Sequence, residues 1–116
     1  DYNTPDGTCV RDYIHVMDLA EAHVSALKLL LEKNDDAFYD TFNLGMGRGA
    51  TVLEIVKTFE DVTGVHPNYQ IGPRRPGDVE QIYADVTKAN TVLHWQTRRS
   101  LGEALQDAWR WQEALR

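Results

Sequence analysis

The chain of 116 residues has the length of about one domain, and its 42% of hydrophobic residues is enough to build a packed core. The 18 acidic and 12 basic residues give a formal net charge of −6. This argues against nucleic acid or an anionic membrane as partner, because both need a positive surface. The single cysteine, Cys9, permits no internal disulfide and fits a cytoplasmic location, and no apolar run approaches the roughly 18 residues of a membrane span.

The chain is expected to begin its regular structure with a strand and a helix. Residues 10–16 alternate between apolar and polar side chains, which is typical of a strand with one buried face. Asp18, with Glu21 three residues later, has the spacing of a capping box that starts a helix. Leucines and alanines at helical spacing continue this helix to about Lys33.

A loop at 34–36 and a short strand at 41–44 are expected next, followed by the glycine-rich stretch 45–49. This stretch lies between a strand and a helix, where a phosphate-binding loop would be found. Its spacing is Gly-x-Gly-x-Gly, which differs from the Gly-x-Gly-x-x-Gly of dinucleotide sites. We therefore favour a turn that lets the chain pass close to a neighbouring element, and a dinucleotide site is the alternative.

A second helix and a third strand are predicted for the middle of the chain. Thr51 and Glu54 form another capping box, and Gly64 is a typical residue for the end of the helix that they start. Residues 68–71 are expected to form a strand that leads into an arginine-containing loop.

Two helices are predicted to close the chain. Asp85 is expected to cap a short helix, and Ser100 with Glu103 forms a third capping box before the last helix. The expected order is therefore β-α-β-α-β-α-α, an α/β chain whose first strands are expected to be parallel because helices separate them. Because two or three strands make a small sheet, the strand at 41–44 is expected to join a larger sheet outside this chain.

Several residues with reactive side chains are interpreted as structural. His15 is expected to be hydrogen bonded within the fold, and the Cys9 thiol to be packed. Asp12 and Asp18 could be the paired acids of a glycosidase, but Asp18 is already explained as a cap. Trp109 and Trp111 diverge on their helix, so one is expected in the core and the other on the surface. Because these residues are interpreted as structural, the residues that carry the function are expected elsewhere in the chain.

The segment Pro73–Asp78 is the strongest candidate for a binding site. Its two arginines lie between two prolines, so they are held on a stiff, irregular loop. Guanidinium groups match phosphate oxygens with paired hydrogen bonds, which suits a diphosphate. Asp78 cannot face that diphosphate favourably but could accept hydrogen bonds from sugar hydroxyls. The segment therefore suggests a nucleotide-sugar, and a solvated loop with a surface ion pair is the alternative.

Taken together, these motifs resemble those of UDP-glucose 4-epimerases, which belong to the extended short-chain dehydrogenase/reductase group. The resemblance covers essentially the whole chain in the right order. The segments that carry it are Thr4–Ala20, Phe42–Gly47, Pro73–Asp78 with Tyr83–Asp85, Leu93–Trp95 and Asp107–Gln112.

The resemblance also implies that this chain is only the C-terminal portion of such an enzyme. The sequence contains neither the catalytic Tyr-x-x-x-Lys nor the glycine-rich NAD loop of the group. The expected fold is thus the C-terminal α/β part, with few strands and several helices, lacking most of the Rossmann sheet. Residues 1–50 are expected to pack on the edge of the missing NAD-binding domain, and residues 51–116 to form a UDP-sugar-binding lobe.

Family roles transfer to three residues. Arg11 and Arg75 match the arginines that hold the UDP diphosphate, and Asp78 matches the acid that binds the nucleotide's ribose. A tyrosine often found four residues after this acid is replaced here by Ile82, and the neighbouring Tyr83 is not a simple substitute because adjacent strand residues face opposite sides. The implied partners are UDP-glucose and UDP-galactose, and the parent enzyme is expected to be a homodimer.

The activity implied for the parent is epimerisation at C4 of the hexose. NAD, bound by the missing domain, takes a hydride from C4, the 4-keto sugar turns over, and the hydride returns to the other face. This chain alone is expected to be inactive. One alternative is that the parent is another nucleotide-sugar enzyme, such as a dehydratase, a decarboxylase or a different epimerase. A second alternative is a non-catalytic nucleotide-sugar binding module.

Overall fold

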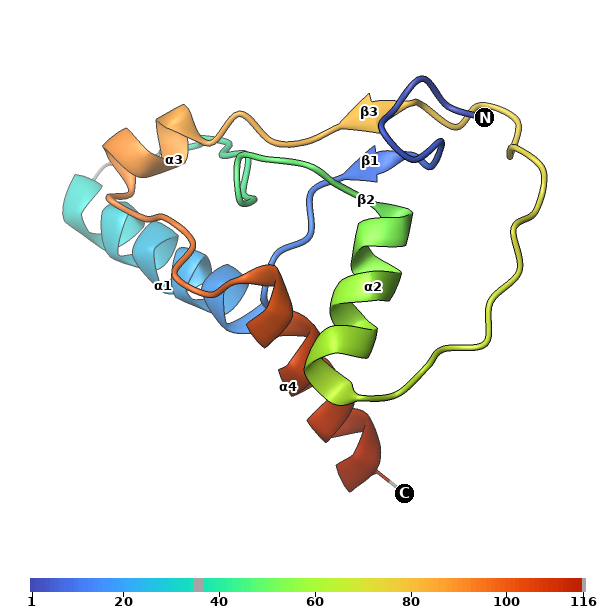
Figure 1. The fold of residues 1–116 in the computed structure, drawn as a ribbon. Helices are drawn as coiled ribbons and strands as arrows, with labels where there is room; N and C mark the ends of the chain where they lie inside the picture. The colour runs from blue at the N-terminus through green and yellow to red at the C-terminus, as the bar shows by residue number, and fades with distance from the viewer. Residues whose placement is uncertain (35–36, 116) are drawn as a thin grey trace.

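The computed structural model describes residues 1–34 and 37–115, so the last two residues of the loop expected at 34–36 lie outside the described residues. Within the described part, three two-residue strands alternate with four helices in the order expected from the sequence (Figure 1). The elements are β1 (Val10–Arg11), α1 (Val16–Lys33), β2 (Ala50–Thr51), α2 (Val52–Thr63), β3 (Gln81–Ile82), α3 (Thr87–Val92) and α4 (Leu101–Ala114).

The strands form one small sheet in the order β2-β1-β3. β1 pairs antiparallel with β2, with Val10 opposite Thr51, and parallel with β3, with Val10 opposite Gln81. The expectation that the first two strands run parallel is therefore wrong. A helix lies between them, but the irregular chain that follows α1 reverses direction before β2. The presence of a helix between two strands in the sequence was therefore not sufficient to predict whether β1 and β2 run parallel or antiparallel.

The first strand is much shorter than the predicted 10–16. It ends at Arg11, because the next residue, Asp12, uses its side chain to accept hydrogen bonds from the backbone N–H groups of Met46 and Ala84. The N–H groups of these two neighbouring segments thereby bond to a carboxylate instead of to the backbone of a longer β1. The chain then runs extended to the start of α1.

The strands predicted at 41–44 and 68–71 are also absent from the sheet, which instead uses the short β2 and β3. Phe42 and Leu44 pack against the core of this chain, and the expectation that residues 41–44 join a sheet outside it stays a prediction. Residues 68–71 are exposed and belong to the long irregular segment between α2 and β3, which Figure 1 shows as a wide arc.

The buried core lies where α1, α3 and the segment before α4 meet. Its buried members are Ala22, Ala89, Leu93 and Trp95. The indole Nε1 of Trp95 donates to the backbone oxygen of Asp18 at 3.0 Å, so this buried ring has a hydrogen-bond partner. The core therefore fixes α1 against the second half of the chain.

The helices α2 and α4 pack against each other through aromatic side chains. Phe59 and Trp109 meet edge to face, with ring centroids 5.4 Å apart and an interplanar angle of 89°. Trp111 is exposed, as expected from its divergence from Trp109. This contact connects the helix that follows β2 to the C-terminal helix.

Two of the three predicted capping boxes are confirmed. Thr51 accepts from the Glu54 N–H and Ser100 from the Glu103 N–H, and each glutamate side chain accepts from the N–H of its cap. Gly64 ends α2 with a φ of 70°, a left-handed conformation that glycine adopts readily.

The predicted cap of the first helix is wrong. α1 begins at Val16, and His15 caps it by accepting the Met17 N–H on Nδ1 at 3.0 Å. Asp18 lies inside the first turn with no exposed surface, and its carboxylate accepts the backbone N–H groups of Arg98 and Arg99. A buried carboxylate needs several donors, and the chain before α4 provides them.

The cap of the short helix α3 is displaced by one residue from the prediction. α3 starts at Thr87 with Val86 in the cap position, whereas Asp85 accepts the Thr87 N–H at 3.0 Å from just outside the helix. The predicted roles of His15 as a hydrogen-bonded structural residue and of Cys9 as a packed thiol are both confirmed.

Candidate functional site

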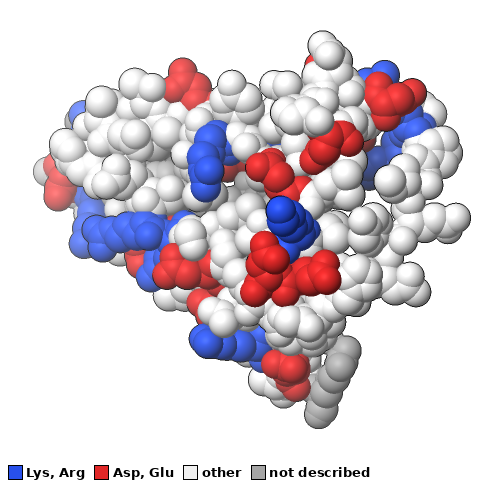
Figure 2. Space-filling view, in the orientation of Figure 1, with Lys and Arg blue, Asp and Glu red and all other residues white. Residues whose placement is uncertain are grey.

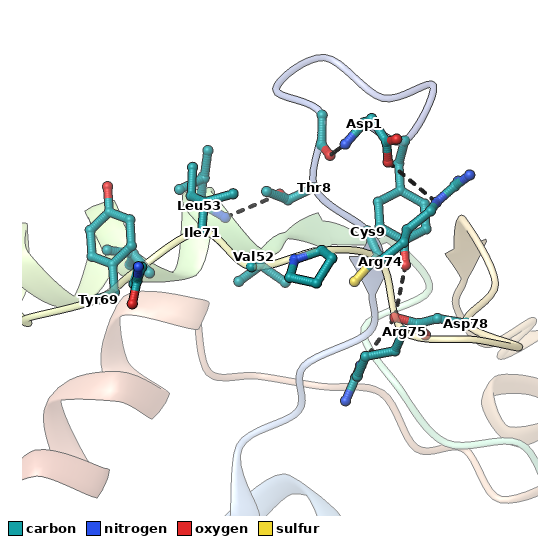
Figure 3. A pocket seen from close by; sticks show the side chains of 16 residues that line it. Asp1, Thr8, Cys9, Val52, Leu53, Tyr69, Ile71, Arg74, Arg75 and Asp78 are labelled. Atoms are coloured by element: carbon teal, nitrogen blue, oxygen red, sulfur yellow. Dashed lines mark hydrogen bonds and ion pairs between the residues drawn. The ribbon is translucent and has the colours of Figure 1, made fainter.

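A cavity of about 590 Å³ lies between the N-terminal loop, the start of α2 and the arginine-containing segment (Figure 3). One wall is the first turns of α2, and the opposite wall is the irregular segment before β3. The lining residues are Asp1, Tyr2, Gly7, Thr8, Cys9, Val52, Leu53, Val56, Tyr69, Gln70, Ile71, Gly72, Pro73, Arg74, Arg75 and Asp78. The cavity thus contains the strongest sequence candidate, the segment 73–78.

Asp78 connects the three residues that the sequence predicted for the site. Its Oδ1 accepts from Arg11 Nη2 at 2.5 Å, and its Oδ2 accepts from Arg75 Nη2 at 3.1 Å. The same Oδ2 accepts from the hydroxyl of Tyr2 at 2.9 Å. The structure therefore brings Arg11, Arg75 and Asp78 together, and adds Tyr2.

The pairing of β1 with β3 places Arg11 beside this cluster. The Val10 N–H donates to the backbone oxygen of Glu80 at 2.9 Å, which aligns the end of β1 with the residues just after Asp78. The Arg11 guanidinium also donates to the backbone oxygens of Val10 and Val79, at 2.6 and 2.8 Å. Arg11 is consequently held by the sheet, with a fixed position.

A tight turn presents Asp78 to the two arginines. Gly77 has a φ of 78°, which a residue with a side chain adopts only with strain, and the Asp78 N–H donates to the Arg75 backbone oxygen at 3.2 Å. The turn folds the carboxylate back toward its own segment. This explains why a Pro-Gly-Asp sequence follows the two arginines.

The surroundings of Asp78 shift its own pKa and the pKa values of Tyr2 and Arg75. The Tyr2 hydroxyl and then the Arg75 guanidinium lower the pKa of Asp78 below its ordinary value. Partial burial, followed by the neighbouring Asp78 carboxylate, raises the pKa of Tyr2. The hydrogen bond with Asp78 raises the pKa of Arg75. Asp78 therefore stays ionised at neutral pH, and Tyr2 stays protonated as the donor.

The two arginines of the loop point in opposite directions (Figure 3). The guanidinium of Arg74 lies over the ring of Tyr2, with its Cζ 3.9 Å from the ring centroid, and its Nε is 3.6 Å from Oδ1 of Asp1. The side chain of Arg75 is 80% exposed. Arg74 thus stabilises the N-terminal loop, whereas the exposed side chain of Arg75 is accessible to a ligand.

The other end of the cavity is apolar. Val52, Leu53 and Val56 come from α2, and Tyr69 and Ile71 come from the opposite segment. A cavity with guanidinium groups at one end and apolar side chains at the other fits a ligand with an anionic part and a flat, weakly polar part. A nucleotide has this composition.

The glycine-rich stretch 45–49 is a close-packed turn, as expected from its spacing. The carboxylate of Asp12 accepts the N–H groups of Met46 at 2.8 Å, Gly47 at 3.2 Å and Ala84 at 3.2 Å. A Cβ on Gly45 would overlap Asp12, and one on Gly49 would overlap Val10. These N–H groups already have an anionic partner, so the stretch does not fit the phosphates of a dinucleotide.

The paired-acid interpretation of Asp12 and Asp18 is not supported either, because both carboxylates are occupied by hydrogen bonds within the protein. Among residues 1–34 and 37–115, no group of three or more His, Cys, Asp or Glu side chains could hold a metal ion. No helix in that same part of the chain is long and apolar enough to cross a membrane. On the face seen in Figure 2, acidic and basic side chains lie side by side without a large patch of one sign.

Sequence reasoning missed Tyr2. It lies in a polar N-terminal stretch, its partner Asp78 is 76 residues away, and no local pattern marks it. It also missed Asp12 as an anchor of the glycine-rich turn, for which the Asp12 partners are 34, 35 and 72 residues away.

Comparison with known proteins identifies the class. Residues 1–108 match the family model described as GDP-mannose 4,6 dehydratase, and the chain belongs to this family. The expected fold class, the C-terminal α/β part of an extended short-chain dehydrogenase/reductase, is confirmed by the solved structures below.

The similar relatives are UDP-glucose 4-epimerases, which confirms the resemblance found in the sequence. The enzyme of Neisseria gonorrhoeae is 50% identical over 111 residues, which are 96% of this chain and 32% of the relative. That of Bacillus subtilis (strain 168) is 50% identical over 114 residues, which are 98% of this chain and 33% of the relative. The chain therefore spans about a third of the length of these relatives.

Solved structures give the same result. UDP-glucose-4-epimerase from Stenotrophomonas maltophila, with bound NAD and formylated UDP-arabinopyranose, matches with a TM-score of 0.92 and 46% identity, over 99% of this chain and 33% of that chain. UDP-glucose 4-epimerase from Bifidobacterium longum, in complex with NAD+ and UDP, matches with a TM-score of 0.85 and 42% identity, over 98% and 33%.

Proposed function

We propose that this chain is the C-terminal, UDP-sugar-binding part of an NAD-dependent UDP-glucose 4-epimerase. The observation that carries the proposal is the convergence of Arg11 and Arg75 on Asp78, since Arg75 and Asp78 line one end of a cavity whose other end is apolar. The chain has about half of its residues in common with UDP-glucose 4-epimerases, and structures of two of its neighbours contain UDP or a UDP-sugar.

In this proposal Arg11 and Arg75 bind the diphosphate, and Asp78 accepts hydrogen bonds from the ribose hydroxyls. A charge-assisted hydrogen bond typically contributes about 1.5–3 kcal/mol, so a few of them can account for much of the affinity for UDP. The hexose has to turn over during C4 epimerisation and therefore cannot be held tightly. Binding through the unreactive UDP leaves it free to turn.

NAD would supply the hydride exchange at C4 of the hexose. The glycine-rich turn of this chain does not fit a dinucleotide, because Asp12 occupies its N–H groups. We therefore place the NAD site in the rest of the parent enzyme, and we expect this chain alone to be inactive.

We also propose that residues 1–50 pack on the NAD-binding domain of the parent, and that residues 51–116 provide most of the UDP-sugar-binding lobe. The outer face of α1 supports the first part, because it leaves apolar side chains exposed at helical spacing: Val16, Val24, Leu27 and Leu31. The cavity itself also uses the N-terminal loop, through Tyr2, Thr8 and Cys9. A homodimeric parent in the cytoplasm remains a prediction.

One alternative function is supported by a specific observation. The family model that the chain matches is described as GDP-mannose 4,6 dehydratase, so a parent that dehydrates a nucleotide-sugar fits the same fold. NMR analysis of the products that the full-length protein forms from UDP-galactose distinguishes the two. UDP-glucose supports the epimerase, whereas loss of water from the hexose supports the dehydratase.

The test of the binding role is Arg75→Ala in the full-length protein. We expect the affinity for UDP, measured by calorimetry, to fall by more than about tenfold, because a guanidinium with paired bonds to phosphate is removed. Arg110→Ala is the matched control, since Arg110 is exposed on α4 and lies outside the cavity. Equal UDP affinity of the Arg75 variant and the wild-type protein would contradict the assignment.

A further inference from the structure

Tyr2 connects the N-terminal loop to the arginine-containing segment 73–78. Its hydroxyl donates to Oδ2 of Asp78 at 2.9 Å, and its ring lies under the guanidinium of Arg74, 3.9 Å from the Cζ. Both partners belong to the segment 73–78, which otherwise runs exposed along the wide arc in Figure 1. Tyr2 therefore holds this segment through a hydrogen bond and a cation–π contact, in addition to the contacts of Asp1 with Arg74 and of Arg11 with Asp78.

The loop that carries Tyr2 is itself fixed to the sheet and to α2. Asp6 accepts hydrogen bonds from the Thr8 N–H, at 2.9 Å, and from the hydroxyl of Thr51, the cap of α2. The Thr8 hydroxyl accepts the Leu53 N–H at 3.3 Å, and the Tyr2 N–H donates to the Gly7 backbone oxygen at 3.1 Å. Tyr2 thus transmits the position of α2 to the arginine-containing segment.

Asp78 passes this constraint on to the arginines. It has two carboxylate oxygens, one occupied by Arg11 and the other shared by Tyr2 and Arg75. Without the Tyr2 hydroxyl, Oδ2 has only the largely exposed Arg75 as partner, and the carboxylate can rotate away from Arg11. The backbone oxygens of Val10 and Val79 hold Arg11 independently, so the hydroxyl of Tyr2 affects the orientation of Asp78 and, through it, that of Arg75.

On this basis we propose that Tyr2 is a positioning residue for the diphosphate site, which orients Asp78 between the fixed Arg11 and the exposed Arg75 and thereby places Arg75. The inference rests on the proposed function, since it takes these arginines as the diphosphate ligands. It adds a role for a residue outside the motif 73–78. The hydroxyl of Tyr2 acts through Asp78, and its ring separately contacts Arg74.

The experiment is Tyr2→Phe in the full-length protein, which removes the hydroxyl and keeps the ring under Arg74. Inorganic pyrophosphate is the probe, as a competitive inhibitor of UDP-galactose turnover, because it presents a diphosphate without ribose or base. We expect its inhibition constant and the KM for UDP-galactose to rise about fivefold, with kcat unchanged, because the loss affects binding of a group remote from C4. Tyr39→Phe is the matched control, since Tyr39 is 88% exposed and outside the cavity.

A double-mutant cycle with Asp78→Asn tests whether Tyr2 acts through Asp78. If it does, Tyr2→Phe has little further effect in the Asp78→Asn protein. An equal loss in both backgrounds overturns the proposed route, including the case in which Tyr2→Phe only loosens the fold. If the inhibition constant of pyrophosphate is the same for Tyr2→Phe and the wild-type protein, the role of Tyr2 is overturned, whereas the proposed function is not. A wild-type protein that neither pyrophosphate nor UDP inhibits overturns the proposed function as well.

Discussion

Two carboxylates of this chain, Asp18 and Asp78, each meet arginine side chains, but in different surroundings. Asp18 has no exposed surface and accepts two backbone N–H groups as well as the guanidinium of Arg99 at 2.6 Å. The side chain of Asp78 is 15% exposed, and its partner Arg75 is 80% exposed. The carboxylate is thus fully buried in one region, whereas in the other region it has an arginine partner, Arg75, that is open to solvent.

This difference separates a structural role from a binding role. The donors around Asp18 are fixed by the chain that leads into α4, so breaking them leaves buried groups without partners. Arg75 reaches Asp78 from the solvent side through Nη2 and is 80% exposed, so a ligand can contact its guanidinium at little cost to the fold, because exposed ion pairs contribute little to stability. Burial, more than residue type, therefore predicts which cluster is available for a ligand.

The largest expected effect is that of Asp18→Ala on stability. The substitution leaves the backbone N–H groups of Arg98 and Arg99 without their acceptor and the Arg99 guanidinium with Glu21 as its remaining partner. Removing one partner of a buried ion pair typically costs about 3–5 kcal/mol. We expect a correspondingly lower free energy of unfolding in urea denaturation of the full-length protein. Asp61→Ala, at an exposed position of α2, is the control. A loss below about 1 kcal/mol would show that the two clusters do not differ as described.

A smaller effect is expected on the pH dependence of stability. Burial on its own raises the pKa of Asp18, but the N–H and guanidinium of Arg99 and the N–H of Arg98 outweigh it and lower the pKa below its ordinary value. A lowered pKa in the folded state stabilises the protein above the unfolded pKa of about 3.9, and this stabilisation is lost as the pH falls through the folded value. Asp18→Asn should therefore make stability less dependent on pH below about pH 4, as measured by denaturation at a series of pH values. An unchanged pH dependence would mean that folding does not shift the pKa of Asp18.

The smallest expected effect is that of Arg75→Ala on stability. Because its side chain is largely exposed, we expect no measurable change in the melting temperature, in contrast to the large loss of UDP affinity. Differential scanning fluorimetry of the full-length protein without ligand tests this. A clear drop in melting temperature would show that Arg75 supports the fold and would remove the contrast with Asp18.

Local signals were read correctly where the partners are close in sequence. Thr51 with Glu54 and Ser100 with Glu103 cap their helices as predicted, because each box closes within one helical turn. Asp18 with Glu21 has the same spacing, yet Asp18 pairs with residues about 80 positions away, and His15 caps the helix instead. Tertiary partners overrode the local pattern, and the sequence alone does not reveal them.

The strands were predicted less well than the helices for a related reason. Each strand has only two residues, so alternation over four to seven residues, as in 10–16 and 41–44, cannot locate it. In the binding site, Arg11, Arg75 and Asp78 could be named because a family resemblance marks them. Tyr2 could not, because its contact with Asp78 depends on how the N-terminal loop folds onto β3.

The carboxylate of Asp12 makes the glycine-rich turn 45–49 unsuitable for binding an anionic ligand. It joins the glycine-rich turn to Ala84, and so fastens the approach to α3 onto the strand that carries Arg11. Any anion entering that turn would have to expel Asp12 and release Ala84 at the same time. Binding of an anion in the glycine-rich turn and the hydrogen bond between Asp12 and Ala84 are therefore mutually exclusive.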